Sequence, residues 1–383
     1  MIKLRTACYL VVLSLLCCRK PYGPPAINSP GSYLVVEGVI NPGSDSTIIK
    51  LSKTVKLSSA TPLNPALGAT VTVESNQGSS CPLIDVNNDG NYSAAALNLP
   101  GSQQYRLKIN TSDGRQYVSD FVPVKLTPAI DSVGYVLTNN NVQLYVNAHD
   151  PANNTHYYRW DYEETWIFHS KYFSDLVVNT NTASIAFRTP AQQIYTCFGN
   201  DASSNIDLGS TANLSQDVVY QAPLTKIPFT SEKFEEKYSI LVQQYALTGD
   251  AYTFYQNLKK NTEQLGSIFD AQPSQINGNI HCLTNPNEPV IGYISATNVQ
   301  SKRIFLLNSI LPPLTMATYP YDCEQDTLPI NGDLTTLLGP PYVFIPINLA
   351  YNKKGVFVGY LYSRPLCVDC TLRGTITQPS FWK

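Results

Sequence analysis

Short runs of alternating apolar and polar residues, separated by Asp-Gly turns, limit the folds that are open to this chain. In GATVTVES (68–75) alanine and valine alternate with threonine and glutamate, which is the pattern of a strand with one buried face. Asp89-Gly90 and Asp113-Gly114 stand between such runs, and each is a strong β-hairpin signal. Strands this short, at this spacing, predict a β-sandwich over residues 33–126.

The second region, residues 127–383, also predicts mainly strands. TPAIDSV (127–133) marks the boundary, and KYSILVQQYAL (237–247) has the composition of a strand. Directly afterwards, apolar residues recur every three to four positions, which predicts one helix near residues 249–265 with Thr248 as its N-cap. Charged residues make up only 14% of the chain, against roughly 25% in ordinary soluble domains. We therefore predict an all-β protein with an N-terminal sandwich and a larger β-rich domain that carries one helical insertion.

The first 17 residues have the pattern of a lipoprotein signal peptide. Lys3 and Arg5 precede an apolar run over residues 7–16, which is too short to span a membrane as a helix. The run ends in SLLCC, which resembles a bacterial lipobox, and we place the lipidated cysteine at Cys18. Cleavage before Cys17 is the first alternative, and an ordinary secretory signal is the second. Residues 18–32 are rich in proline, glycine and serine and read as a tether. The expected location is the outer membrane, with a lipid anchor.

The cysteines of the mature chain predict disulfides. Nine cysteines minus three in the signal and lipid site leave Cys81, Cys197, Cys282, Cys323, Cys367 and Cys370. The envelope is oxidising, so disulfides persist there. The C-x-x-C pair near the end lacks the second ligand pair that a zinc ribbon needs. TLRGTIT follows it and disfavours the helix on which a thioredoxin-type motif depends. We predict that Cys323 pairs with Cys367 or Cys370, that the other reaches Cys197 or Cys282, and that the bridges clamp a terminal strand onto the second domain.

Two stretches contain potential metal ligands, and neither matches a known metal motif. DVNNDG (85–90) resembles the start of a calcium loop, with Asp85, Asn87 and Asp89 at alternate positions. Position twelve should be an acid but is Ala96, so an Asp-Gly hairpin is favoured. The second stretch gathers His149, Asp150, His156, Asp161, Glu163, Glu164 and His169 at spacings that fit no metal motif. The sequence predicts no metal site and no cofactor.

An aromatic stripe is the candidate ligand site. If residues 157–166 form a strand, one face carries Tyr158, Trp160, Tyr162 and Trp166. This stripe could be a stacking platform for a sugar or a peptide, or it could be core, which the alternation favours because every half-buried strand has it. The opposite face carries Arg159, Asp161 and Glu163, which we interpret as a ladder of charges rather than an acid–base pair.

Motifs for catalysis are absent from the sequence. It contains no G-x-S-x-G elbow, no P-loop and no G-x-G-x-x-G. His281 and Cys282 are neighbours, but adjacent side chains of a strand point to opposite faces. We therefore expect no catalytic residues and no enzyme. The net charge of −2 provides no basic surface for nucleic acid.

Several segments together resemble one known family. They are YLVVEGVI, HYYRWDYEETW, YSILVQQYALTGDAYTFYQNLKKNTEQLG, EPVIGYISATNVQSKRIF and the terminal CVDCTLRGT with PSFW. In this order they resemble the Bacteroidota envelope lipoproteins catalogued as domain of unknown function 4249. The order of the early strands also resembles that of transthyretin-like and other Ig-like envelope modules.

The family resemblance implies a role in import. The family has no established activity, but its members are often encoded beside TonB-dependent outer-membrane receptors. This implies a non-catalytic binding or accessory subunit of such a receptor, with a free-standing glycan- or peptide-binding module as the alternative and a hydrolase third. Arg19 and Lys20 follow Cys18 where surface-exposed members often carry acidic residues, so the membrane face stays open. The small-molecule or glycan ligand is not identified by the sequence.

Overall fold

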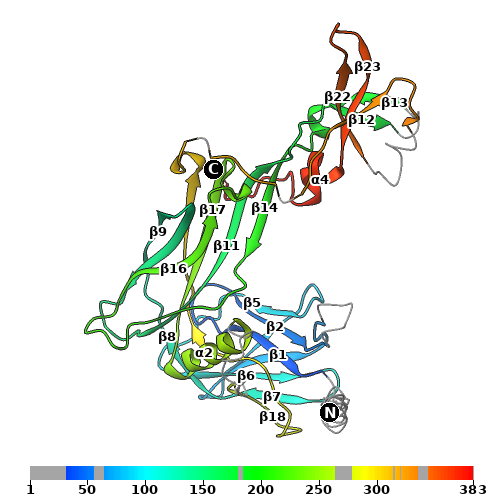
Figure 1. Ribbon diagram of the computed structural model, residues 1–383. Helices are drawn as coiled ribbons and strands as arrows, with labels where there is room; N and C mark the ends of the chain where they lie inside the picture. Colours follow the sequence, from blue (N-terminus) through cyan, green and yellow to red (C-terminus); the bar gives the residue numbers. More distant parts are fainter. Residues whose placement is uncertain are drawn as a thin grey trace, which may run out of the picture.

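The protein is organised as three β-rich units stacked along one long axis (Figure 1). The computed structural model describes residues 32–55, 64–179, 184–263, 278–313, 315–319, 321–334 and 344–382. The predicted signal peptide, Cys18 and nearly all of the predicted tether lie outside these ranges. Among the described residues, no helix has the length and apolar character needed to cross a bilayer.

The first unit is a two-sheet sandwich, and it contains the strands expected within residues 33–126. They are β1 (Leu34–Val39), β2 (Thr47–Lys53), β3 (Thr70–Ser75), β4 (Ser80–Leu83), β5 (Asn91–Ala94), β6 (Gln104–Asn110), β7 (Gln116–Ser119) and β8 (Val122–Lys125). One sheet has the order β1-β2-β5, and the other contains β7-β6-β3-β4 with β8 beside β6. The alternation in β3 buries Val71 and Val73 between the sheets, as its sequence predicts.

The assignment of all residues from 127 to 383 to the second domain has to be corrected, because a later segment returns to this first unit. Strand β18 (Ile280–Cys282) extends the larger sheet by pairing with β7, and β19 (Ala296–Thr297) pairs with β8. Between these strands Ile291 pairs with Val35 of β1, and Ile294 is fully buried in the same core. Residues 280–297 therefore complete the N-terminal sandwich, which is discontinuous in sequence.

The second unit is a larger sandwich at the centre of the molecule. Its three-stranded sheet consists of β9 (Ile130–Thr138), β10 (Asn141–His149) and β16 (Val218–Pro228) in the order β16-β10-β9. Its other sheet contains β11 (Tyr157–His169), β14 (Thr196–Ala202), β15 (Asp207–Ser210), β17 (Lys237–Ala246) and β20 (Gln300–Leu307). Asn139 and Asn140 both have positive φ and form the two-residue turn that joins β9 to β10.

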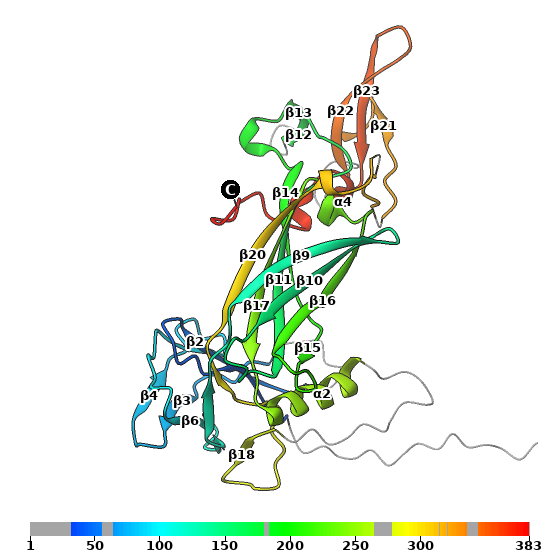
Figure 2. The same cartoon turned by 90° about the vertical axis from the view of Figure 1, so that its left-hand side faces the viewer.

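The third unit is a small distal lobe, opposite the first unit in Figure 2. Its strands are β12 (Leu176–Asn179), β13 (Ser184–Phe187), β21 (Asp326–Pro329), β22 (Ile345–Tyr351) and β23 (Phe357–Ser363). The sequence did not predict a separate lobe here. Each of its strands is short, and each pairs with strands of the same lobe rather than with the central sheet.

Two disulfides hold the C-terminal segment. Cys323 is bonded to Cys367, and Cys370 is bonded to Cys197, so the pairing is one of the combinations that the sequence left open. Cys282 is buried and free, and so it takes no part in the staple. The prediction of a terminal strand is wrong, because the C-x-x-C spans a short helix, α4 (Pro365–Val368), and a 3-10 turn, η4 (Cys370–Leu372). Pro365 at the first helical position, where its missing N–H costs nothing, favours this turn over a strand.

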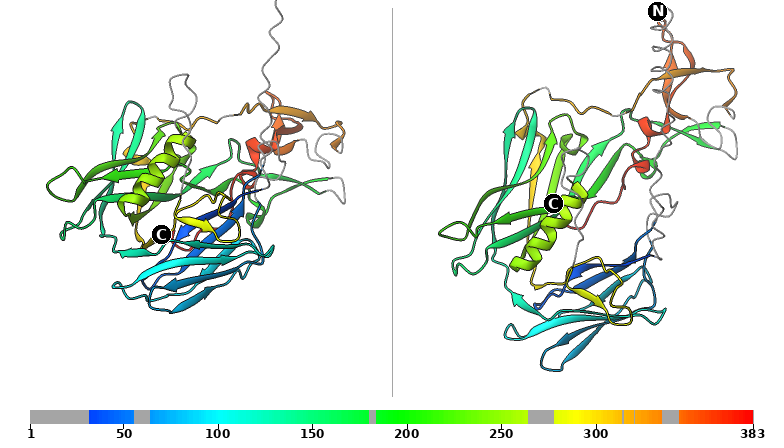
Figure 3. Two further views of the ribbon diagram at one scale, coloured as in Figure 1. Left: turned by 90° about the horizontal axis from the view of Figure 1, so that it is seen from below. Right: turned by 60° about the horizontal axis from the view of Figure 1, so that its bottom comes forward.

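The helix predicted near residues 249–265 is α2 (Gly249–Glu263). The Thr248 hydroxyl accepts a hydrogen bond from the backbone N–H of Ala251, as expected of an N-cap. Figure 3 shows α2 lying across strands of the central unit and beside the N-terminal sandwich. The helix therefore stands where the first two units meet.

Candidate functional site

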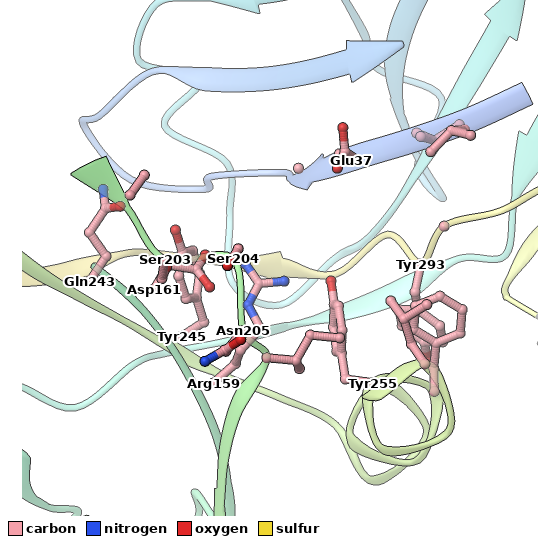
Figure 4. A pocket seen from close by; sticks show the side chains of 18 of the residues that line it. Glu37, Arg159, Asp161, Ser203, Ser204, Asn205, Gln243, Tyr245, Tyr255 and Tyr293 are labelled. Carbon is pink, nitrogen blue, oxygen red and sulfur yellow. Dashed lines mark hydrogen bonds and ion pairs between the residues drawn. The ribbon is translucent and has the colours of Figure 1, made fainter. Parts of the chain in front are cut away.

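A pocket of about 590 Å³ lies where the N-terminal sandwich, the central sheet and α2 come together (Figure 4). Four segments that are distant in sequence form its walls: residues 35–38 of β1, residues 159–163 of β11, residues 202–206, and residues 291–293. Strand β17 and helix α2 supply the remaining lining side chains, which are Gln243, Tyr245, Phe254, Tyr255 and Leu258. Ligand sites of this size are common at junctions between domains.

The charged side of β11 faces this pocket. Trp160 and Tyr162 point into the core of the central sandwich, so alternation turns Arg159, Asp161 and Glu163 to the opposite face. The C-terminal residues cover another part of that face, where Trp382 packs against Ile167 and Phe198. The outward charges of β11 are therefore left in a bay between α2 and the C-terminal residues.

Arg159 is held between two tyrosine rings. Its guanidinium carbon lies 4.4 Å from the ring centre of Tyr245 and 4.7 Å from that of Tyr255, so it joins the sheet to the helix by cation–π contacts. One terminal nitrogen donates to the Asp161 carboxylate at 2.9 Å. Its Nε is buried without a hydrogen-bond partner among the described residues, and 14% of its side chain is exposed. The positive charge is thus largely satisfied within the protein.

The wall formed by residues 202–206 is held in place through the backbone N–H and carbonyl groups of Ile206. The Ile206 N–H donates to Glu263 at 2.6 Å, and its carbonyl accepts from the Lys259 ammonium group at 2.6 Å. Both partners belong to the last turns of α2, and they also form an ion pair with each other at 3.6 Å. The Ser203 hydroxyl in turn accepts from the backbone N–H of Tyr162. This wall is therefore fastened to both α2 and β11.

Asp207 lies directly behind this wall. Burial raises the pKa of Asp207 to about 7, the nearby Lys259 opposes the rise, and Glu263 and Asp161 add to it. One carboxyl oxygen is buried and has no hydrogen-bond partner among the described residues. Asp207 thus carries a proton over part of the pH range in which other aspartates are ionised.

β1 and the returning segment close the pocket on the side of the N-terminal sandwich. Glu37 faces it from β1 and forms an ion pair with Lys50 of β2 at 3.4 Å. Tyr293 packs against Phe254 of α2 with ring centres 5.4 Å apart. Burial raises the pKa of Tyr293, so its hydroxyl stays protonated. The pocket thus combines amide, hydroxyl, carboxylate and guanidinium groups with aromatic walls.

The aromatic stripe forms the core of the central sandwich, which is the interpretation that its alternation favours, and the alternative of a stacking platform is wrong. Tyr158, Trp160, Tyr162 and Trp166 are only 0% to 8% exposed. The Trp160 indole N–H donates to Gln244, and the Tyr158 hydroxyl donates to the buried Asp217. These rings are unavailable to a ligand because the three-stranded sheet covers them.

The potential metal ligands are not brought together. Within the described ranges no three His, Cys, Asp or Glu residues gather as a metal site requires. His149 contacts Asp131 at the surface, and His169 lies between Glu235 and Glu236. In the 85–90 loop Asp85 accepts from the backbone N–H groups of Asp89 and Gly90, which is turn chemistry.

The other residues that the sequence offers for chemistry also lie apart. His281 is exposed and contacts Asp120, whereas the adjacent Cys282 is buried and contacts Thr284. Arg159 and Asp161 form the expected charge pair along one strand. Four residues that line the pocket were not predicted from the sequence as site residues: Glu37, Gln243, Tyr245 and Tyr255. The charged face of β11 was the sequence feature that pointed toward them, because a strand face with three charged residues needs polar or aromatic partners on the elements that pack beside it.

Comparisons with known proteins give a family but no activity. A family described as domain of unknown function (DUF4249) matches residues 19–303. No curated protein matches the chain. Among solved structures, Escherichia coli alpha-2-macroglobulin activated by porcine elastase is similar at 12% identity and a TM-score of 0.19. That similarity covers 57% of this chain and 19% of the macroglobulin, and it carries no argument about fold or function.

Proposed function

The chain belongs to the family described as domain of unknown function DUF4249, and from this premise we propose that it is an outer-membrane lipoprotein of the Bacteroidota type that binds a ligand without transforming it. The lipid is attached at Cys18, and the protein serves as an accessory subunit of a TonB-dependent import receptor. The observation that carries the proposal is the pocket at the junction of the first two units.

The composition of the pocket favours binding over catalysis. Its described lining contains neither histidine nor cysteine, and the Ser203 hydroxyl already accepts a backbone hydrogen bond. Nucleophilic catalysis needs a base within hydrogen-bond reach of the nucleophile. Asp161 is paired with Arg159 and Glu37 with Lys50, so both carboxylates are already engaged by a cation of the protein.

The position of the pocket suits a subunit that works beside a receptor in the same membrane. β1 begins at Leu34, directly after the proposed tether over residues 18–32, and β1 is itself a wall of the pocket. A tether of that length spans at most about 50 Å when fully extended. A ligand in the pocket would therefore stay within reach of a receptor mouth at the membrane surface.

Co-purification from native membranes tests this function. The tagged full chain is extracted in mild detergent and compared with a Cys18→Ala variant and with an unrelated lipoprotein of similar abundance. We expect one TonB-dependent receptor to be enriched with the wild-type chain only. Equal recovery of receptors with all three baits would refute the accessory role. Ligand binding by the purified chain without any partner would then favour the free-standing binding module.

A further inference from the structure

Several polar side chains of the pocket have no hydrogen-bond partner in the part of the chain that the structure describes. Within the described residues, the side chains of Ser204, Asn205 and Gln243 make no hydrogen bond. Gln243 stands directly opposite Asp161 in the register of β11 and β17, so an amide and a carboxylate point into the pocket side by side. An amide both donates and accepts, and a carboxylate only accepts. Such a pair fits a ligand with neighbouring hydroxyl groups.

The carboxylates of the pocket have cations beside them. Asp161 binds Arg159 at 2.9 Å, and Glu37 binds Lys50 at 3.4 Å. Burial lowers the pKa of Arg303, and the attraction of Glu163 partly offsets that effect. Because Asp161 and Glu37 are ion-paired and Glu163 attracts Arg303, most of the charge around the site is balanced within the protein, which does not favour a charged ligand. An uncharged ligand meets no electrostatic penalty from this balance.

The two strands that wall the pocket, β1 and β11, are paired along both edges, which argues against a peptide that adds to either of them as an extended strand. β1 is bonded to β2 on one side, and on the other Val36 N–H donates to the Ile291 carbonyl at 2.8 Å. β11 lies between β17 on one side and β14 and β15 on the other. A peptide that binds as an added strand needs a free strand edge. Recognition here must therefore go through side chains.

Apolar walls complete the site. Phe254, Tyr255 and Leu258 of α2 line one side, and Val35, Ile206 and Ile291 supply aliphatic surface elsewhere. Apolar surface beside a few directional polar groups is the usual composition of a small-molecule pocket. A saccharide has both features, because its C–H faces are apolar and its hydroxyl groups point outward around the ring.

We propose that the ligand of this pocket is an uncharged oligosaccharide, held by Gln243, Asn205 and Asp161. This inference rests on the proposed function as a binding subunit and names its ligand class. Vicinal hydroxyl groups donate to the Asp161 carboxylate and accept from the Gln243 and Asn205 amides, while the ring faces lie against the side chains of α2.

Calorimetry on the full mature chain tests the proposal, in a detergent whose head group is not a sugar. The probes are neutral gluco-, manno- and xylo-oligosaccharides, with oligogalacturonate as the acidic counterpart and glucosamine oligomers as the cationic one. The variants are Gln243→Ala and Asn205→Ala. Gln116→Ala, an exposed amide on β7 away from the pocket, is the matched control. We expect a neutral probe to bind and each pocket variant to bind it about threefold to tenfold more weakly, with an unchanged unfolding temperature.

Three results would overturn the proposal. They are binding of the charged probes alone, binding of a neutral probe that both pocket variants retain, and binding of no probe. Receptor co-purification is measured separately. If the receptor is recovered but one of these three results is obtained, the saccharide proposal is rejected and the proposed accessory role stands. Sugar binding without receptor recovery would reject the accessory role and keep the saccharide site.

Discussion

Replacing Gly209 by alanine would place a methyl group against the indole ring of Trp160. A Cβ built on Gly209 lies 2.5 Å from Cη2 and 2.7 Å from Cζ3 of that ring, well inside van der Waals contact. The ring has little room to move, because Trp160 is 1% exposed and its N–H donates to Gln244 at 2.8 Å. Gln244 is itself fixed by donating to the Pro128 carbonyl.

Overpacking of this kind costs typically about 1–3 kcal/mol of unfolding free energy. We expect Gly209→Ala to lower the free energy of unfolding by an amount in this range. The clashing atoms belong to the Trp160 ring, which is buried and fixed by its hydrogen bond to Gln244, so the ring cannot move aside. The free energy of unfolding is measured by urea titration followed by tryptophan fluorescence. Gly101→Ala is the control, since a Cβ at Gly101 meets nothing within 4 Å.

A second substitution tests whether the Trp160 ring causes the loss of stability in Gly209→Ala. Trp160→Phe removes the outer ring atoms that the new methyl would meet, although it lowers stability by itself. The double variant should therefore lose at least about 1 kcal/mol less than the sum of the two single losses, since contacting residues are not additive. Additive losses, or a Gly209→Ala variant as stable as Gly101→Ala, would show that Trp160 does not pack where the central core places it.

Three further outcomes are expected. Replacing both Cys197 and Cys370 by alanine should lower the free energy of unfolding by up to about 5 kcal/mol, because their bridge closes a loop of 173 residues; an unchanged urea midpoint under oxidising conditions would contradict this. Asp207→Asn should gain stability over the wild type as the pH rises from 4 to 8, because the unfolded chain releases the Asp207 proton near its ordinary pKa of 3.8 and the folded chain only at about 7. The wild type loses at most about 4 kcal/mol through this window, and solvent screening of the partly exposed carboxyl reduces that figure; parallel pH profiles would argue against it. Metabolic labelling with palmitate should be lost in Cys18→Ala and retained in Cys17→Ala, and the reverse pattern would move the lipid by one residue.

The strands could be predicted from the sequence because each depends on local alternation. β3 and β10 bury every second residue, and the two Asp-Gly turns come just before β5 and β7. The helix was predictable for the same reason, with Thr248 as its cap. These features are properties of neighbouring residues.

The return of residues 280–297 to the first sandwich could not be predicted in the same way. β18 is three residues long and β19 two, so neither has enough alternation to be recognised. Their place is set by long-range pairing with β7 and β8. A break in composition near residue 127 marks where the chain leaves the sandwich, but it contains no information about where the chain comes back.

The aromatic stripe of β11 is core, as its alternation favours, but the pocket beside the charged stripe could not be predicted, for one physical reason. Alternation assigns side chains to two faces, but it does not say what covers each face. The three-stranded sheet covers Trp160 and its neighbours, whereas α2 and the N-terminal sandwich only partly enclose Arg159. The charged face does carry the expected Arg159–Asp161 pair, but it is also the wall of a pocket, which the alternation of one strand does not reveal.

The presence of a charged arginine on a mostly buried face of β11 is the strongest reason to regard the adjoining pocket as a binding site. Arg159 leaves one nitrogen buried without a partner among the described residues, and an unpaired buried polar group costs about 1–3 kcal/mol. An apolar residue between Tyr245 and Tyr255 would avoid that cost and still join α2 to the sheet, since replacing buried charges by well-packed apolar groups is often neutral or stabilising. Stability alone therefore does not explain the arginine. A ligand that needs the Asp161 carboxylate in one orientation does explain it, because the guanidinium fixes that carboxylate beside Gln243 before the ligand arrives.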